Sequence, residues 1–520
     1  GAVLSCLKAR REAEATAERF GDDDTTAAEV NRQILEALEN GTSGLWLRIG
    51  DGLSADDLAT VLDGVYLDLI PVTLDARADG LAAARALLAQ RERAVAAPQA
   101  AAPTVATVTS LGFSPLTAAF SGRPDVDTAD ATTLAAEVGA GVRTFRVDGT
   151  DFATAGADNG LELALIVAAA VTHLRDLTAA GVSTADALGQ ITFAVSAGDD
   201  QFATIAKFRA LRKMWSRIAE VVGAPEAGAA LTHGVTDLSM QTQRDPWVNM
   251  LRTTIAAFGA GVGGADQVTV LGFDAAIPTD QRTSSATFSR RIARNTQLLL
   301  LEESNVGRVL DPAGGSWFVE SLTDEMAANA WSVFGEIEGA GGYRSVLESG
   351  WIGNRVGASL ARRDDSVAHR TIAVTGVNEF PNLDEKPLGA PIADTAEIPL
   401  GTPRLARVGR VFEELRDRSD AVLATTGERP SVLLLPLGPV AEHNARTTFV
   451  ANLLAAGGIS AINPGPLTAD GIADAVRDNR ASIAVLCASK QRYADDGAAA
   501  LAAARATDLS SVLMAGPDKE

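Results

Sequence analysis

The sequence predicts an α/β protein in which a (β/α)8 barrel is followed by a helical linker and a small doubly wound domain. Two observations carry this prediction. Short apolar, β-branched runs alternate with amphipathic helical segments over residues 41–320, and the same alternation returns over residues 431–520. Strands that alternate with helices indicate parallel β/α units, and eight such units over roughly 250 residues are typical of a TIM barrel.

Eight candidate strands make up the predicted barrel. They are residues 44–50, 66–72, 104–113, 142–149, 190–198, 229–236, 267–273 and 307–313. The segments between them, such as 161–181 and 202–223, have apolar residues at helical spacing and end in glycine, as many helices do. Residues 1–40 are charged and helical in pattern, so we expect an N-terminal helical segment before the barrel.

The C-terminal half changes character after the barrel. Residues 321–430 combine helical stretches with a Pro-rich extended stretch, which predicts a linker. Strands are expected near 432–436, 459–463, 482–487 and 511–514, with helices between them. This pattern predicts a small doubly wound sheet that stops one β/α unit short of five strands.

Composition narrows the possible functions. The formal net charge of −21 would repel a nucleic-acid backbone. Because no run of about 18 uninterrupted apolar residues occurs, we expect no membrane span. Cys6 and Cys487 do not form a disulfide framework, which fits a reducing cytosol and a cytoplasmic protein.

One motif and the spacing of the histidines argue against nucleotide and metal sites. The segment "GAGVGG" (259–264) matches G-x-G-x-x-G, but a helix precedes it and a strand follows, which is the reverse of the dinucleotide motif. Helix termination is the better interpretation, and no P-loop motif is present. The four histidines, His173, His233, His369 and His443, include no pair at metal-ligand spacing, so we expect no metal site.

Polar residues gather at the predicted carboxyl ends of the barrel strands, where barrel enzymes hold their chemistry. They are Asp148, Asp151, Ser196, Asp199, His233, Asp237, Asp274 and Asp311. Several of them open helices, so N-capping is the structural alternative for most. His233 is either a catalytic group or a core histidine bonded to the backbone, and the sequence leaves both possible. A mouth rich in Asp and poor in Arg or Lys is a poor receptor for phosphate.

A second candidate site lies in the C-terminal domain. Residues 433–458 read as a strand, a turn and a helix, and the turn carries Glu442 beside His443. Doubly wound folds bind ligands at such turns. An adjacent carboxylate and imidazole could act there as an acid–base pair or as ligands.

Several blocks closely resemble methylmalonyl-CoA mutases. They are residues 147–177, 202–223, 288–327 and "TGVNEFPN" at 375–382. The resemblance implies a (β/α)8 barrel joined by a linker to a flavodoxin-like cobalamin domain. It also implies isomerisation between methylmalonyl-CoA and succinyl-CoA by a radical from adenosylcobalamin, in which the cofactor supplies the hard chemistry.

The same resemblance implies that this chain has lost the catalytic positions. Catalytic members carry D-x-H-x-x-G in the first turn of the cobalamin domain, and the His binds cobalt. The matching positions here are Val440, Glu442 and Ala445, and Pro436 stands at the family's upstream Lys. In the barrel, the substrate-facing positions are Ala153, Leu231, His233, Val235 and Ala275, of which only the histidine keeps its family type.

This pattern resembles the small, non-catalytic subunit of the heterodimeric bacterial mutase. We therefore expect no catalytic, cofactor-binding or metal-binding residues in this chain, and adenosylcobalamin in a large catalytic partner subunit. One alternative is a divergent mutase in which His443 becomes a cobalt ligand shifted by one residue. Another is a regulatory or acyl-CoA-binding module, which nothing basic in the barrel mouth favours.

Overall fold

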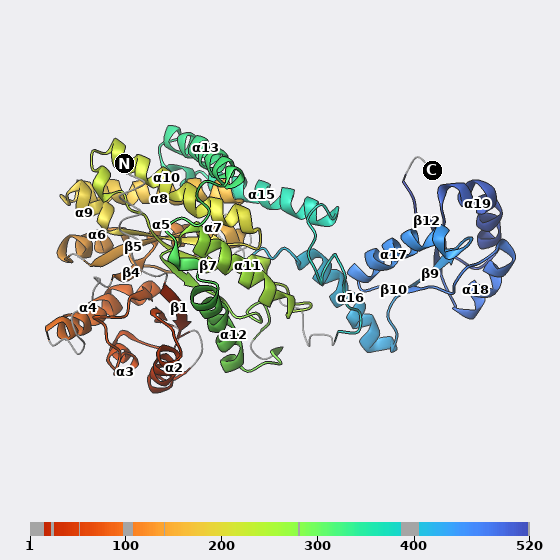
Figure 1. Ribbon diagram of the computed structural model, residues 1–520, viewed down its shortest axis with the longest axis horizontal. Coiled ribbons are helices and arrows are strands. Elements are labelled where there is room, and N and C mark those ends of the chain that lie inside the picture. Colours follow the sequence, from red (N-terminus) through yellow and green to blue (C-terminus); the bar gives the residue numbers. More distant parts are fainter. Residues whose placement is uncertain are drawn as a thin grey trace.

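The computed structural model describes residues 15–21, 25–50, 52–96, 108–139, 141–278, 281–385 and 405–517. Its larger part is a closed barrel of eight parallel strands surrounded by helices. Its smaller part is a four-stranded parallel sheet at the other end of the molecule, beyond helix α16 (Figure 1). Predictions for residues 1–14, 104–107 and 386–404, including Cys6, lie outside the described residues.

The barrel strands run consecutively around the ring, which confirms the predicted barrel. They are β1 (Ala15–Phe20), β2 (Gly44–Arg48), β3 (Val72–Asp75), β4 (Thr109–Phe113), β5 (Val142–Asp148), β6 (Ile191–Ala197), β7 (Leu231–Thr236) and β8 (Gln267–Thr269). β1 closes the ring, because Ala15 pairs with Gln267 and Thr16 with Val268 of β8.

Helices on the outside of the ring cover the strands. They are α2 (Ala27–Glu39), α3 (Leu58–Val61), α4 (Gly80–Ala96), α5 (Pro115–Ser121), α6 (Thr128–Glu137), α7 (Thr150–Ala155), α8 (Asn159–Ala179), α9 (Thr184–Gly189), α10 (Gln201–Val221), α11 (Val248–Gly263) and α12 (Ala286–Leu298). Helix α11 ends within the "GAGVGG" segment, and Gly264 caps it with a φ of 95°. The interpretation of this motif as a helix terminus is therefore confirmed.

The first barrel strand was not predicted, since residues 1–40 were expected to be helical. Residues 15–20, ATAERF, favour a helix by composition, yet they form β1. Tertiary contacts overcome that preference. Glu18 bonds the Thr42 hydroxyl and lies 3.0 Å from Arg294 of α12, while the Arg19 guanidinium lies over the Trp46 ring. The barrel therefore begins before residue 41.

Two other predicted strands were wrong. Residues 307–313 form the end of a 3-10 turn, η7 (Val306–Arg308), and a loop. Val309 and Leu310 in that loop are 63% and 46% exposed, so this apolar run is not a buried strand. Residues 66–70 form a turn, and the strand predicted at 66–72 starts only at Val72, after Pro71, which has no N–H to pair.

The chain after the barrel is mostly helical up to the small sheet. Its helices are α13 (Trp317–Gly339), α14 (Tyr343–Glu348), α15 (Trp351–Ala368) and α16 (Arg410–Thr426). Helix α13 crosses the predicted linker boundary at residue 320 and joins the outer helical layer, where Glu320 lies 2.7 Å from Arg209 of α10. Helix α16 is fixed to the loop after β7, because Glu413 accepts the Gln243 N–H at 2.7 Å.

The small sheet has the strand order β10-β9-β11-β12. Its elements are β9 (Ser431–Pro436), α17 (Val440–Ala456), β10 (Ser460–Ile462), α18 (Ile472–Asp478), β11 (Ile483–Cys487), α19 (Lys490–Arg505) and β12 (Ser511–Met514). All four strands lie where the sequence predicted them. The sheet is bonded to the linker, since the Ser419 hydroxyl of α16 donates to the Gly458 carbonyl at 2.5 Å.

The main apolar core fills the space between the barrel strands and the outer helices. Helix α8 runs through this core and is buried on almost every side. The carboxylate of Glu162, in the first turn of α8, lies 2.8 Å from Lys207 of α10 and accepts hydrogen bonds from the Ser196 N–H and hydroxyl. Burial raises the pKa of Glu162, and Lys207 opposes that effect.

Replacing Lys207 with Met should destabilise the barrel strongly, because it leaves Glu162 buried without its counter-charge. The expected loss is about 3–5 kcal/mol in the free energy of unfolding, measured from the barrel transition in urea. Lys213→Met is the matched control on the same helix. Its ion pair with Asp324 is exposed, so the loss should be at most about 1 kcal/mol. Equal losses in the two variants would contradict the structural role of the buried pair.

Candidate functional site

The first candidate site is the mouth of the barrel, where two predicted aspartates come together. Arg123 lies 2.8 Å from Asp151 and 3.5 Å from Asp125. Asp148 pairs with Arg146 on its own strand and accepts the Thr150 N–H at 3.1 Å. Burial raises the pKa of Asp125 to about 6. These carboxylates bind arginines of the same chain, so the mouth is less poor in Arg than the sequence suggested.

The other predicted mouth residues support the fold rather than converge on a site. The Asp237 carboxylate caps a turn by accepting the Ser239 N–H at 2.8 Å, and Asp274 accepts the Ser289 hydroxyl at 2.6 Å. Ser196 is bonded within the Glu162–Lys207 cluster. Asp199 lies 3.8 Å from Arg252 of α11. Asp311 does not end a strand at all and pairs with Arg209 in the outer helical layer.

The barrel interior is filled by side chains that the sequence did not single out. Trp46 of β2 is buried, and the guanidinium carbons of Arg19 and Arg146 lie 4.6 and 4.8 Å from its ring centroid. The His233 ring packs edge-on against the indole at 5.3 Å. Cation–π and aromatic contacts of this kind favour a closely packed interior. A cavity of about 20 Å³ among the described residues is lined by side chains that include Arg146, Thr192, Leu231 and His233.

His233 is a core histidine, and its partner is a side chain rather than the backbone. Its Nε2 lies 2.8 Å from the Thr269 hydroxyl, which donates its own proton to the Ala17 carbonyl at 3.0 Å. Thr269 therefore accepts, so the Nε2 of His233 carries the proton. Burial and the nearby Arg146 lower the pKa of His233 to about 3, so the ring is neutral at ordinary pH.

The remaining barrel positions that the resemblance marked as degenerate offer no polar side chain. Leu231 and Val235 flank His233 on β7, and Val235 is buried. Ala153 is buried in α7, and Ala275 lies in the turn after β8. None of these four side chains can bond a substrate group or transfer a proton.

The second candidate site is the turn between β9 and α17. Pro436 ends β9, Val440 is 57% exposed at the first position of α17, and Ala445 is exposed one turn later. Glu442 is bound by Arg492 of α19 at 2.8 and 3.2 Å, and these bonds lower the pKa of the Glu442 carboxyl. A hollow of about 380 Å³ lies beside this ion pair, between the turn and Leu467.

Glu442 and His443 do not form an acid–base pair. His443 is buried, on the side of α17 that carries Thr447 and Val450. Val450 belongs to the apolar cluster against the small sheet. Glu442 instead points to Arg492 across the opening of the turn. The two side chains thus have separate surroundings, although neither ring nitrogen of His443 has a hydrogen-bond partner among the described residues.

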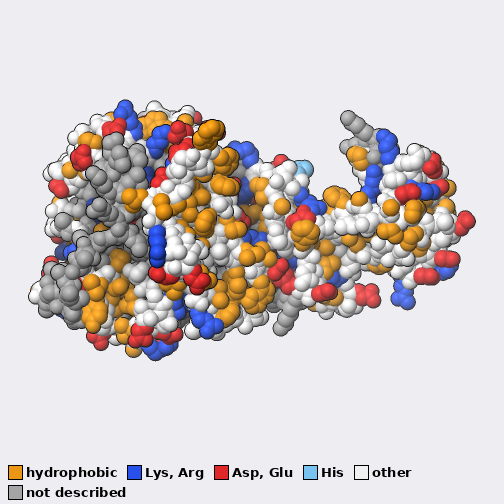
Figure 2. Space-filling view, in the orientation of Figure 1, with side chains coloured by type: hydrophobic (Ala, Val, Ile, Leu, Met, Phe, Trp, Pro, Cys, Tyr) orange, Lys and Arg blue, Asp and Glu red, His pale blue; other side chains and the backbone are white. Residues whose placement is uncertain are grey.

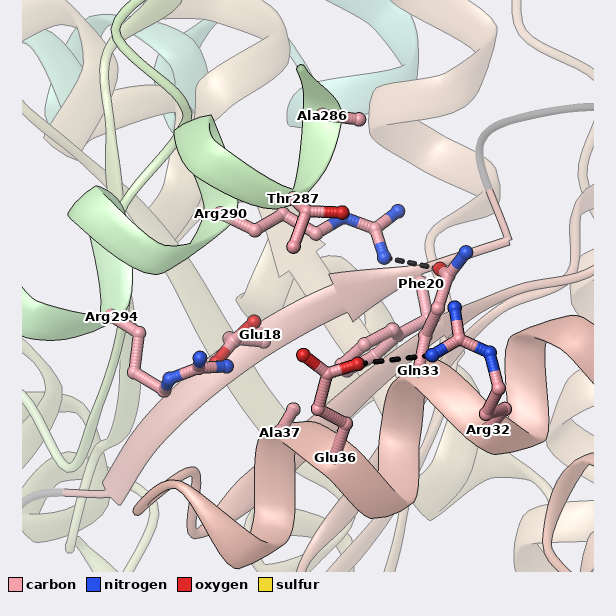
Figure 3. Close-up of a pocket in the computed structure, with 10 residues that line it drawn as sticks. All are labelled: Glu18, Phe20, Arg32, Gln33, Glu36, Ala37, Ala286, Thr287, Arg290 and Arg294. Carbon is pink, nitrogen blue, oxygen red and sulfur yellow. Dashed lines mark hydrogen bonds and ion pairs between the residues drawn. The ribbon is translucent and has the colours of Figure 1, made fainter.

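One further pocket, which the sequence analysis missed, lies outside the barrel between β1, α2 and α12. Its volume is about 60 Å³. Figure 3 shows its charged side chains close to one another, with Arg32 on Glu36 and Arg290 on Gln33. Arg294 forms an ion pair with Glu18. Two of its three arginines pair with glutamates, and Arg290 bonds the neutral amide of Gln33. The pocket is small, which is typical of a crevice between packed helices.

Neither a metal centre nor a membrane helix emerges from the described residues. No group of three His, Cys, Asp or Glu side chains among them is placed to hold a metal ion. No helix in the described ranges is long and apolar enough to cross a membrane. Cys487 is a buried free thiol in β11.

Comparison with known proteins matches the barrel and linker to one family. The family model for methylmalonyl-CoA mutase matches residues 51–424. A protein of Mycobacterium tuberculosis (strain H37Rv) named "Probable methylmalonyl-CoA mutase small subunit" is 50% identical over 509 residues, which are 97% of this chain and 80% of the relative. The small subunit of Streptomyces virginiae is 46% identical over 94% of this chain and 78% of its own length.

A more distant relative has the same name. The methylmalonyl-CoA mutase small subunit of Propionibacterium freudenreichii is 35% identical over 502 residues, covering 94% of this chain and 75% of that protein. The closed parallel barrel agrees with these matches. The chain therefore belongs to the methylmalonyl-CoA mutase family.

Proposed function

We propose that this chain is the non-catalytic small subunit of a heterodimeric methylmalonyl-CoA mutase. In this proposal the large subunit holds adenosylcobalamin and the acyl-CoA substrate, and this chain packs beside it. The observation that carries the proposal is the ion pair between Glu442 and Arg492, at the position where the family places its cobalt ligand. A cobalt-binding His offers the metal a neutral imidazole with a free nitrogen. Glu442 instead offers a carboxylate that a guanidinium already binds through two hydrogen bonds.

The positions around Glu442 support the same conclusion. Val440 stands where an Asp would orient the cobalt-binding His, and an isopropyl group accepts no hydrogen bond. Pro436 replaces the upstream Lys, and Ala445 replaces the Gly. A hollow of about 380 Å³ lies beside the turn, but the side chains that would bind and orient a cobalt ligand there have been replaced.

The barrel interior supports a non-catalytic role independently. One cavity, lined mainly by residues at the amino ends of the barrel strands, measures about 20 Å³ and holds a water-sized molecule, whereas pockets for small-molecule ligands usually measure roughly 300–1,000 Å³. Trp46 and Arg146 would have to move before an acyl-CoA group could enter. That movement would break the Arg146–Asp148 pair and expose the indole.

The small sheet is proposed to be the remnant of a flavodoxin-like cobalamin domain. Its order, β10-β9-β11-β12, corresponds to the first four strands of the order 2-1-3-4-5. We accordingly propose a barrel that begins at β1, a linker that ends near residue 430 and a remnant over residues 431–520. Cytoplasmic location remains a prediction, to which the free thiol of Cys487 adds modest support.

One alternative function has a specific observation in its favour. The unpartnered ring nitrogens of His443 could serve a divergent mutase in which this residue binds cobalt. Against it, His443 is buried on the sheet side of α17, and Val440 cannot orient the ring. We therefore favour the partner-subunit function.

Adenosylcobalamin binding separates the two functions. The purified chain, mixed with adenosylcobalamin and passed through gel filtration, should elute without the visible absorbance of the corrin, because no cobalt ligand faces the turn. The same mixture with the large subunit should elute with corrin in the protein peak, and the large subunit alone serves as control. Stoichiometric corrin in the peak of this chain alone would rule out the partner-subunit function.

Replacing His443 with Leu tests the shifted ligand in the assembled enzyme. Leucine fills a similar volume on the sheet side of α17 and removes both unpartnered nitrogens. We expect the co-expressed complex to keep its isomerase rate within about twofold, in the range of a substitution remote from the chemistry. His443→Ala is the companion variant. A large loss of rate in both, with unchanged subunit association and thermal unfolding, would favour the shifted ligand instead.

A further inference from the structure

An apolar surface lies on the outer helices of the barrel, and neither the fold nor the proposed site accounts for its exposure. Its members are exposed side chains of α10, α11, the loop after η7 and the start of α13. We call this set the aromatic face: Phe202, Leu251, Ile255, Val309, Leu310, Trp317 and Phe318. Figure 2 shows hydrophobic side chains on the visible side of the barrel, over the region of α11.

Contacts link the elements that carry this surface. The Phe202 and Phe318 rings meet edge to face at 5.3 Å and so join α10 to α13. Beneath them a buried cluster contains Ile205, Val262 and Val319, with Phe258 and Val306 packed at its margin. Leu251 and Ile255 are four residues apart on α11, so they share one side of that helix.

The aromatic face is large enough to be an interface. Trp317 is 92% exposed and Leu251 is 65% exposed. At roughly 150–250 Å² for a fully exposed large side chain, the seven residues present on the order of 800 Å² to solvent. The largest apolar patch on a typical monomer is about 300–600 Å². A stable interface takes about 800 Å² from each partner.

Several charges beside the aromatic face form ion pairs within this chain. Arg209 lies 2.7 Å from Glu320 and also binds Asp311, and Lys213 lies 2.6 Å from Asp324. The three carboxylates outnumber the two cations in this cluster, so the cluster would not attract a nucleic-acid backbone. Trp and Phe at the centre with paired charges beside them are typical of a protein–protein interface.

We infer that the aromatic face is the docking surface for the large mutase subunit. This inference rests on the proposed partner-subunit function and adds where the partner sits. The relatives are named small subunits, which implies a large one. The required occupant is a folded subunit with a complementary apolar surface, because about 800 Å² of exposed apolar area is what one side of a stable dimer provides.

Subunit association in matched variants tests the surface. Leu251→Asp and the pair Trp317→Ser with Phe318→Ser place polar groups within the aromatic face. Val221→Asp is the control, since Val221 is also a helical aliphatic side chain with 65% exposure, at the far end of α10. We expect the first two to weaken binding to the large subunit by at least about tenfold, and the control by less than about twofold. Circular dichroism and thermal unfolding verify that each variant folds.

The possible outcomes separate the surface from the function. If the wild-type chain forms no complex with the large subunit, the partner-subunit function fails, and the docking surface fails with it. If the wild type binds and the aromatic-face variants bind equally well, only the docking surface is overturned. If the wild type alone forms a dimer that Leu251→Asp dissociates while heterodimer binding persists, the face belongs to a second copy and the inference is also overturned.

Discussion

Closure of the barrel by β1 is the constraint on which the rest of the structure depends. This strand pairs with β2 on one side and β8 on the other, so without it the sheet would have two open edges. Successive side chains of β1 also point to opposite faces of the sheet. Glu18 bonds outward to α12, and Arg19 lies inward over Trp46. The strand that closes the ring therefore helps to fill its centre.

In the two candidate sites, the carboxylates and the Nε2 of His233 are bound by other groups of the same chain, whereas neither ring nitrogen of His443 has a hydrogen-bond partner among the described residues. Asp148 is held by Arg146, His233 by Thr269, and Glu442 by Arg492. The acids and bases of an active site usually have pKa values that suit proton transfer. Here the pKa of His233 is too low for that role, and the scaffold around it is intact.

The local sequence pattern predicted an element correctly where the apolar residues of that element are also the buried ones. The β-branched strands β5 and β6 and the whole small sheet lie where the sequence predicted them, and the helix end at Gly264 was recognised from its neighbours. Long-range contacts decided the rest. The charged residues of β1 fit a barrel strand because Glu18 pairs with Arg294 of α12 and Arg19 lies over the Trp46 ring. The apolar run at Val309 looked like a strand, but it is exposed on the aromatic face.

For the candidate sites, too, the sequence predicted residue identities but not the contacts between distant segments. The identities of Val440, Glu442 and Ala445 follow from the resemblance alone, but the ion pair of Glu442 depends on α19, which is distant in sequence. The packing of Trp46 against Arg19, Arg146 and His233 depends on the barrel register and could not be read from any one segment.

The number of cobalamins in the assembled enzyme tests the central claim most directly. Native mass spectrometry of the purified complex of this chain with its large subunit, saturated with adenosylcobalamin, gives that number without dissociating the subunits. A non-catalytic small subunit predicts one corrin per heterodimer, released with the large subunit when the complex is separated in the gas phase. Two corrins per heterodimer, or one that leaves with this chain, would contradict it.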